Sequence, residues 1–160
     1  MVVRPARLQD IPQIRKLAAE AYAQSRYASG LGMDLDVLTK VLISFITLQA
    51  DKPGEGLVVV GEDEEGEICS IFAGVVATLY HCLDALMASN AIWYAQRGCH
   101  PDLSLGVLDY FVDWVEQSEH PVLHRYVITD GIIDNHHAIG ALLVRKRGFR
   151  LAGGVYEKGI

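Results

Sequence analysis

The sequence predicts a mixed α/β (α+β) fold, in which a mostly antiparallel central sheet of six to seven strands is flanked by about four helices. Runs of β-branched residues alternate with segments of helical periodicity, and an acidic turn separates two of these runs. Hydrophobic residues make up 51% of the chain, which is typical of a globular core. Because 160 residues suit one domain, a single domain over residues 1–160 is expected.

The first third of the chain predicts one strand and two helices. Met1–Ala6 can form a short strand, and Asp10 is typical of a helix N-cap, with Gln13 completing a capping box. Pro12 is tolerated in the first turn. Apolar residues then recur at helical steps, namely Ile11, Ile14, Leu17, Ala18, Ala21 and Tyr22. A second helical pattern begins at Asp34 and ends at Asp51–Gly56.

The middle of the chain predicts antiparallel strands. Leu57–Val60 and Ile68–Thr78 are rich in β-branched residues, and Asp63–Gly66 between them is a suitable hairpin turn. Leu79–Met87 is ambiguous between strand and helix. Ser89–Gln96 is predicted as the next strand and ends at Arg97-Gly98.

The last third returns to alternating elements. Leu105–Val115 has helical spacing, and Val122–Thr129 follows Pro121 as a strand. Asn135–Arg147 is predicted as a helix with a basic end that stops at Gly148. Phe149–Ile160 is expected to close the chain with one or two short strands.

Charge and composition exclude several kinds of partner. Lys and Arg number 14 and Asp and Glu 20, so the net charge of −6 disfavours a nucleic-acid partner. The longest charge-free stretch, Ile68–Leu83, is shorter than the roughly 20 residues that span a membrane, and no secretory pattern opens the chain. The three cysteines, Cys69, Cys82 and Cys99, lack paired spacing and are expected to be free thiols in a cytoplasmic protein.

Three segments, in this order, resemble the GCN5-related N-acetyltransferase (GNAT) superfamily. Val3–Ile14 resembles its first strand and helix, Ile92–Gly98 its fourth strand and the start of its phosphate-binding loop, and Lys146–Phe149 the end of its last helix. The likeness covers nearly the whole chain and is nearest to short, divergent acetyltransferase-like proteins encoded by bacteriophages. It implies the GNAT fold, with acetyl-CoA as cosubstrate.

The resemblance also implies where the cofactor binds. The pantetheine arm would lie along Trp93, Tyr94 and Ala95, and the pyrophosphate would meet the loop at Arg97 and Gly98 and the following helix N-terminus. The family's loop reads Arg-Gly-x-Gly-x-Gly/Ala, whereas His100 and Asp102 stand at the second and third glycine positions of this chain.

Two interpretations of this loop stay open. In the first, Pro101 begins a helix that caps itself and binds no phosphate, because the Asp102 carboxylate occupies the positive end of the helix dipole. In the second, an insertion follows Gly98, so that Ser104-Leu-Gly106 forms the working turn and Arg97 supplies a fixed positive charge.

The resemblance gives an incomplete set of catalytic groups. Val144 stands where the family often has a proton-donating tyrosine, so Tyr94 is the substitute donor, unless it is an ordinary core aromatic. His137 falls at the family's cofactor-binding asparagine, or Asn135 does if the helix is longer, and either could instead cap that helix. Conceivable bases, none selected by spacing, are His81, Asp130 and Asp134.

Other polar groups have equally local explanations. Arg145–Arg147 and Arg150 could meet the 3′-phosphate of coenzyme A or could complement the dipole of the last helix. His81-Cys82, Cys99-His100 and His136-His137 are adjacent ligand pairs, a spacing that zinc sites do not favour, so no metal is expected.

Two function classes therefore remain. The first is an acyl-CoA-dependent N-acetyltransferase, in which a small-molecule or protein amine attacks the thioester directly; nothing in the sequence identifies that amine. The second is a catalytically inactive GNAT-like interaction module, such as a homodimer or a bacteriophage accessory protein. No membrane or nucleic-acid partner is expected in either class.

Overall fold

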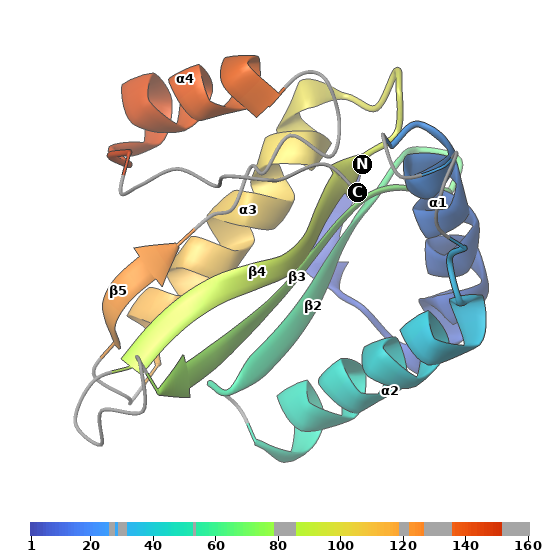
Figure 1. Ribbon diagram of the computed structural model, residues 1–160, viewed down its shortest axis with the longest axis horizontal. Helices are drawn as coiled ribbons and strands as arrows, with labels where there is room; N and C mark the ends of the chain where they lie inside the picture. The colour runs from blue at the N-terminus through green and yellow to red at the C-terminus, as the bar shows by residue number, and fades with distance from the viewer. Residues whose placement is uncertain are drawn as a thin grey trace.

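The computed structural model describes residues 1–25, 28, 32–52, 54–78, 86–118, 122–126 and 136–151. Within these ranges the chain forms one five-stranded sheet with two helices on each face (Figure 1). The elements are β1 (Val2–Pro5), η1 (Leu8–Asp10), α1 (Ile11–Ala23), α2 (Leu35–Asp51), β2 (Gly56–Glu62), β3 (Ile68–Thr78), β4 (Leu86–Ala95), α3 (Pro101–Glu116), β5 (Val122–Tyr126) and α4 (His136–Arg147).

The strands lie in the order β1-β2-β3-β4-β5. Neighbours from β1 to β4 are antiparallel, whereas β4 and β5 are parallel. The predicted hairpin between β2 and β3 is confirmed, and the Asp63 carboxylate closes its turn by accepting from the backbone N–H groups of Glu65 and Glu67. Gly66 supplies the positive φ of +84° that this turn needs.

The described strand count is lower than the predicted six to seven. Five strands are present in the described ranges, and Phe149–Leu151, where a further strand was expected to begin, are not in a strand. The rest of that segment, residues 152–160, lies outside the described residues. Of the ambiguous segment Leu79–Met87, Leu86 and Met87 are described, and both lie in β4; residues 79–85 lie outside the described residues.

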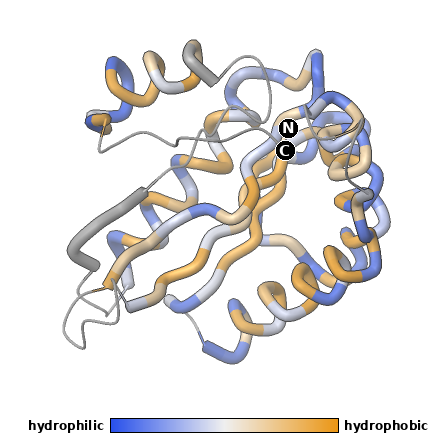
Figure 2. Tube along the Cα trace, in the orientation of Figure 1, coloured by the Kyte–Doolittle hydropathy of each residue, from blue (hydrophilic) through white to orange (hydrophobic). Residues whose placement is uncertain are grey.

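Each face of the sheet carries its own hydrophobic core. Val58 and Val60 face the core formed with α1 and α2, whereas Leu57 and Val59 face the core formed with α3 and α4. Because helices cover both faces, β2 is apolar at successive positions rather than alternating with polar residues. Figure 2 shows this hydrophobic colouring running along the central strands.

Two predicted helix starts have different outcomes. The second helix begins at Asp34 as expected, and Asp34 is its N-cap, since its carboxylate accepts from the backbone N–H groups of Asp36 and Val37, both at 2.9 Å. The capping box predicted at the start of α1 is wrong. The Asp10 carboxylate instead accepts from Arg4 and from the backbone N–H of Arg7, while Gln13 Oε1 accepts from the backbone N–H of Ile68 on β3, at 2.8 Å.

Candidate functional site

The two edges of β4 are paired to different extents. Along β3 the pairing runs through the whole of β4, with Ala91 bulged out where the register shifts. On the other edge, the described pairing with β5 covers only Leu86–Ser89, because Tyr126, the partner of Ser89, is the last described residue of β5. In the described part of the chain, no strand pairs with Ala91–Ala95 on that edge. Backbone groups there can bind an extended ligand.

The predicted strand residues Trp93, Tyr94 and Ala95 share a backbone but not a face. The Trp93 indole N–H donates to the Ser104 carbonyl of α3 at 3.1 Å. Tyr94 points to the opposite face, where its hydroxyl accepts from Gln24 Nε2 of the α1 C-terminus, also at 3.1 Å. A ligand along this edge can therefore contact the backbone groups of all three residues, but not all three side chains.

Tyr94 is a buried phenol, with 7% of its surface exposed. Burial raises the pKa of Tyr94, although the hydrogen bond from Gln24 opposes this shift. Because Gln24 is the donor in that bond, it does not use the phenolic proton of Tyr94. The raised pKa keeps the Tyr94 hydroxyl protonated, as a proton donor must be.

The loop that follows β4 forms a tight, exposed turn. The Cys99 N–H donates to the Gln96 carbonyl at 3.0 Å, and Gly98 between them has a φ of +91°. This conformation favours glycine, because a side chain at positive φ meets its own backbone. Arg97 lies beside Gly98 with its side chain exposed to solvent.

The helix that begins after this loop is self-capped. The His100 ring accepts from the Asp102 N–H through Nδ1 at 3.3 Å, and the His100 carbonyl accepts from the N–H groups of Leu103 and Ser104. Pro101 stands in the first turn, as expected. The N–H groups that usually await a ligand at a helix N-terminus therefore have internal partners.

The working turn predicted at Ser104-Leu-Gly106 is wrong as a conformation. Ser104, Leu105 and Gly106 all lie inside α3, because the helix already begins at Pro101. Ser104 Oγ donates to the Pro101 carbonyl at 2.9 Å, and a Cβ at Gly106 would lie 2.9 Å from Val3 Cγ2 of β1. The structure thus has the self-capped helix of the first interpretation, and Gly106 permits close packing of α3 on β1.

The start of α3 can accept an anion if one side chain moves. Arg97 and the dipole of α3 give this turn a positive potential, next to the β4 backbone at Ala91–Ala95. The His100 side chain is 51% exposed and its cap is long, so the ring can swing aside and release the Asp102 N–H. The exposed Asp102 carboxylate remains the one unfavourable charge among the described residues of this turn.

The remaining predicted residues lie mainly on or beside α4. His137 is in its first turn, but its side chain is outside the described part of the structure. Val144 is half exposed on that helix. Arg147 is engaged by Asp109 of α3, with Nε–Oδ1 at 2.5 Å and Nη2–Oδ2 at 2.7 Å, and this carboxylate raises its pKa. Residues outside the described ranges are His81, Asp130, Asp134 and Asn135.

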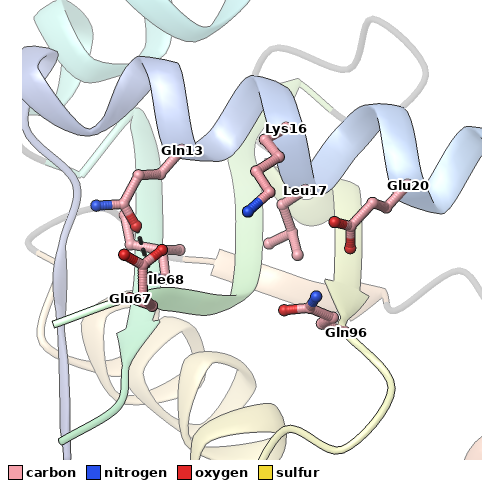
Figure 3. A pocket seen from close by; sticks show the side chains of 7 residues that line it. All are labelled: Gln13, Lys16, Leu17, Glu20, Glu67, Ile68 and Gln96. Atoms are coloured by element: carbon pink, nitrogen blue, oxygen red, sulfur yellow. Dashed lines mark hydrogen bonds between the residues drawn. The ribbon is translucent and has the colours of Figure 1, made fainter. Parts of the chain in front are cut away.

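A small polar pocket, not predicted from the sequence, lies between α1 and the ends of β3 and β4 (Figure 3). Its volume of about 30 Å³ admits one or two waters, so it is too small for an acceptor as it stands. The helical spacing of its α1 residues is the sequence signal that could have indicated a shared face. The lining residues are Gln13, Lys16, Leu17, Glu20, Glu67, Ile68 and Gln96.

The described residues contain neither a membrane-spanning helix nor a cluster of metal ligands. No helix there is long and apolar enough to cross a bilayer. No group of three or more His, Cys, Asp or Glu side chains is gathered there to hold a metal ion.

Comparisons with known proteins show what the fold is similar to. No protein-family model and no curated protein sequence matches the chain. A ribosomal-protein-alanine N-acetyltransferase from Brucella melitensis matches with a TM-score of 0.65 at 11% identity, over 100% of both chains. A "possible acetyltransferase" from Clostridium difficile 630 gives 0.66 at 15% identity, over 99% of this chain and 97% of the other.

A transcriptional regulator from Bacillus halodurans also matches, with a TM-score of 0.67 at 11% identity over 99% of each chain. At such identities the likeness establishes the fold alone, since one fold can serve several functions. The predicted α+β fold is thereby confirmed apart from its strand count, whereas the likeness to bacteriophage-encoded proteins stays a prediction.

Proposed function

We propose that this chain is a single-domain, divergent GNAT-superfamily acyltransferase, which transfers an acetyl group from acetyl-CoA to an amine. The observation that carries the proposal is the edge of β4 at Ala91–Ala95, which no described strand pairs with, beside the N-terminus of α3, in a fold shared over its length with acetyltransferases. The β4 edge, where the pantetheine arm would lie, is thus next to the α3 N-terminus, where the pyrophosphate would lie.

In this proposal each described group has a separate role. The backbone of Ala91–Ala95 hydrogen-bonds the amides of the pantetheine arm, while Arg97 and the Gly98 turn bind the pyrophosphate. The cofactor supplies an activated acyl thioester. The incoming amine attacks its carbonyl, so a C–N bond forms, the C–S bond breaks, and the amine proton must leave while the thiolate gains one.

Tyr94 is the described side chain best suited to protonate the departing thiolate. It lies on the strand beside the expected thioester, and its raised pKa keeps it protonated near neutral pH. Val144 cannot take this role, because it has no proton to give. Replacing Tyr94 with Phe should therefore lower kcat and remove the high-pH limb of the kcat profile, while the Kd for acetyl-CoA changes little.

The alternative is an interaction module without catalysis, including a homodimer. The His100 cap at α3 and the position of Val144 are the observations in its favour. It is the weaker proposal, because His100 can move and Tyr94 offers a substitute donor.

Calorimetric titration with acetyl-CoA and with CoA tests the proposal first. We expect binding in the micromolar to millimolar range. Arg97→Ala should weaken it about 5- to 30-fold, as for loss of one charge-assisted hydrogen bond. Lys40→Ala removes an equal charge from α2 on the other face of the sheet and should leave the Kd unchanged. No detectable binding at millimolar ligand would sink the proposal.

A turnover assay then distinguishes an enzyme from a binding module without catalysis. Thiol release from acetyl-CoA is followed with a panel of amines, which includes a peptide with an N-terminal alanine because one structural neighbour is named for that acceptor. We expect turnover with at least one amine, and loss of it in Arg97→Ala at subsaturating cofactor. Binding without turnover by any amine would favour the interaction module.

A further inference from the structure

Two cysteines meet beside the β4–α3 loop, although they lie far apart in the sequence. Cys69 is on β3 and is buried, whereas Cys99 is in the loop and is partly exposed. Their Sγ atoms lie 2.6 Å apart. That is closer than two unbonded sulfurs normally pack, and about 0.6 Å beyond the roughly 2.05 Å of a disulfide bond. Both are free thiols in the structure, as predicted.

The surrounding backbone keeps the two thiols together. The Gln96 N–H donates to the Cys69 carbonyl at 2.8 Å, so the loop starts from a fixed point on β3. The neighbouring pair Ser70 and Ala95 is in register in the sheet. Cys99 is then set by the Gly98 turn and by the Cys99 N–H bond to Gln96. The proximity therefore follows from strand register and turn geometry.

We propose that Cys69 and Cys99 are a modification site, a thiol pair that a low-molecular-weight disulfide oxidises to an intramolecular disulfide. This bond would fasten the β4–α3 loop, with Arg97 and Gly98, to β3. The proposal does not depend on the acyltransferase activity, because it rests only on the positions of the two sulfurs.

The oxidation proceeds by two exchanges that balance. The accessible Cys99 thiolate attacks a disulfide RSSR, so a Cys99–S–S–R bond forms and RS⁻ leaves. The Cys69 sulfur then attacks the Cys99 sulfur, the bond to R breaks, and RSH departs with the proton of Cys69. Two electrons pass from the protein to RSSR, which ends as two thiols.

The second exchange should limit the rate. Burial and the adjacent Cys99 thiol raise the pKa of Cys69 to about 12, so little thiolate is present near neutral pH. Burial is the larger cause, and it remains when Cys99 carries R. The closing step should therefore accelerate about tenfold per pH unit between pH 7 and pH 9, because the Cys69 thiolate fraction rises by that factor.

The test uses the full chain carrying Cys82→Ser and glutathione disulfide as the oxidant. Trypsin leaves Cys69 and Cys82 together in residues 41–97, because Lys52 precedes proline, whereas Cys99 lies in residues 98–125. After acid quenching and alkylation, we expect first a transient adduct of one glutathione per chain. The final product should be about 2 Da lighter than the reduced chain and should contain a cross-link between these two peptides.

Thermal melting supplies an independent readout. Closing a loop across these positions should raise the melting temperature by about 5–10 °C, and dithiothreitol should reverse the gain. Cys99→Ser should show neither the adduct nor the gain, while Cys69→Ala should stop at the glutathione adduct. A lasting adduct in the Cys82→Ser protein, adducts on both thiols, or no oxidation at millimolar glutathione disulfide in the folded protein would overturn the proposal.

Discussion

His100 and Asp102 decide how well the start of α3 can take an anion. The His100 ring nitrogen accepts from the Asp102 N–H, which a phosphate oxygen would otherwise use, and the exposed ring can be displaced from it. Asp102 acts differently, because its carboxylate is 87% exposed and only adds negative charge to the positive end of the helix. The two departures from the glycine-rich loop are therefore not equally damaging to phosphate binding.

Asp102→Asn should tighten the binding of CoA by about two- to fivefold at low ionic strength, which corresponds to about 0.3–1 kcal/mol at a helix terminus. The gain should shrink in high salt, because the charge is exposed. Calorimetry at two salt concentrations measures both effects. Asp36→Asn makes the same change in the first turn of α2 and should leave the Kd unaltered; an equal gain there would mean that only net charge matters.

Asp10 gives the protein a specific acid sensitivity. Its side chain is 7% exposed and accepts two hydrogen bonds from Arg4, at 2.7 and 3.1 Å, while Arg4 also binds Glu62 of β2. Burial alone would raise the pKa of Asp10, but the bonds from Arg4 and the Arg7 N–H outweigh it, so the pKa is lowered. Folding therefore favours the carboxylate form.

A lowered folded pKa means that stability from Asp10 is complete above its unfolded pKa of about 3.9, and is lost as pH falls through the folded value. Asp10→Asn should lower the free energy of unfolding by about 1–3 kcal/mol at pH 7. The difference from the parent should narrow below pH 4. Urea unfolding across pH 2–7 measures this, with the exposed Asp113→Asn as control. A constant difference over that range would rule out Asp10 as the titrating group.

Some elements are fixed by local chemistry and others are not. The helix from Asp34 and the hairpin around Asp63–Gly66 were predicted because helical apolar spacing and turn residues are patterns of residues close together in the sequence. The bulge at Ala91 and the parallel pairing of β5 were not predicted, because they depend on strands distant in sequence. Gln13 is a further example, because its side chain was predicted to cap α1 but accepts a hydrogen bond from the backbone N–H of Ile68 on β3, which is distant in sequence.

The candidate site was predicted less completely than the fold. Arg97 and Gly98 were found at a turn, as a dipeptide can indicate. The start of α3 at Pro101 agrees with the first of the two interpretations of the loop, although the apolar periodicity is clear only from Leu105. The contact between Cys69 and Cys99 has no local signal at all, because strand register creates it.

Gly74 of β3 sets how closely α3 can approach the sheet. A Cβ there would collide with the ring of Phe111, which is itself packed in the core. Gly74→Ala should therefore cost about 1–3 kcal/mol of unfolding free energy. Gly140→Ala in α4 meets no atom within 4 Å and should instead stabilise the protein by about 0.5–1 kcal/mol. Urea unfolding distinguishes them, and equal effects would contradict this account of α3 packing.

The contact between α3 and α4 determines which basic residue at the end of α4 can bind a phosphate. Because Arg147 is held by Asp109, it is poorly placed to bind a 3′-phosphate, whereas Arg150 is exposed and has no such partner among the described residues. Arg147→Ala should leave the ratio of the Kd values for CoA and dephospho-CoA unchanged, and Arg150→Ala should lower the preference for CoA. A ratio that changes only in Arg147→Ala would assign the phosphate to Arg147.

In the part of the chain that the structure describes, the sheet is the only layer that the two hydrophobic cores share. Val58 and Val59 are consecutive and point to opposite faces, so each core is built on the same backbone. Strands of this kind transmit the loss of packing on one face to the other, because a strand cannot separate from one core and stay ordered in the other. This arrangement predicts one cooperative unfolding transition for the described domain.

Leu42→Ala tests that cooperativity, because its mutation and its reporter lie on opposite faces. Leu42 of α2 is fully buried in the first core, whereas both tryptophans, Trp93 and Trp114, pack in the core beneath α3. The substitution should cost about 2–5 kcal/mol and lower the melting temperature by about 5–15 °C. Tryptophan fluorescence should show the same shift as far-ultraviolet circular dichroism. If the fluorescence midpoint stayed at the parent value, the two faces would unfold separately; the exposed Val144→Ala should move neither signal by more than about 2 °C.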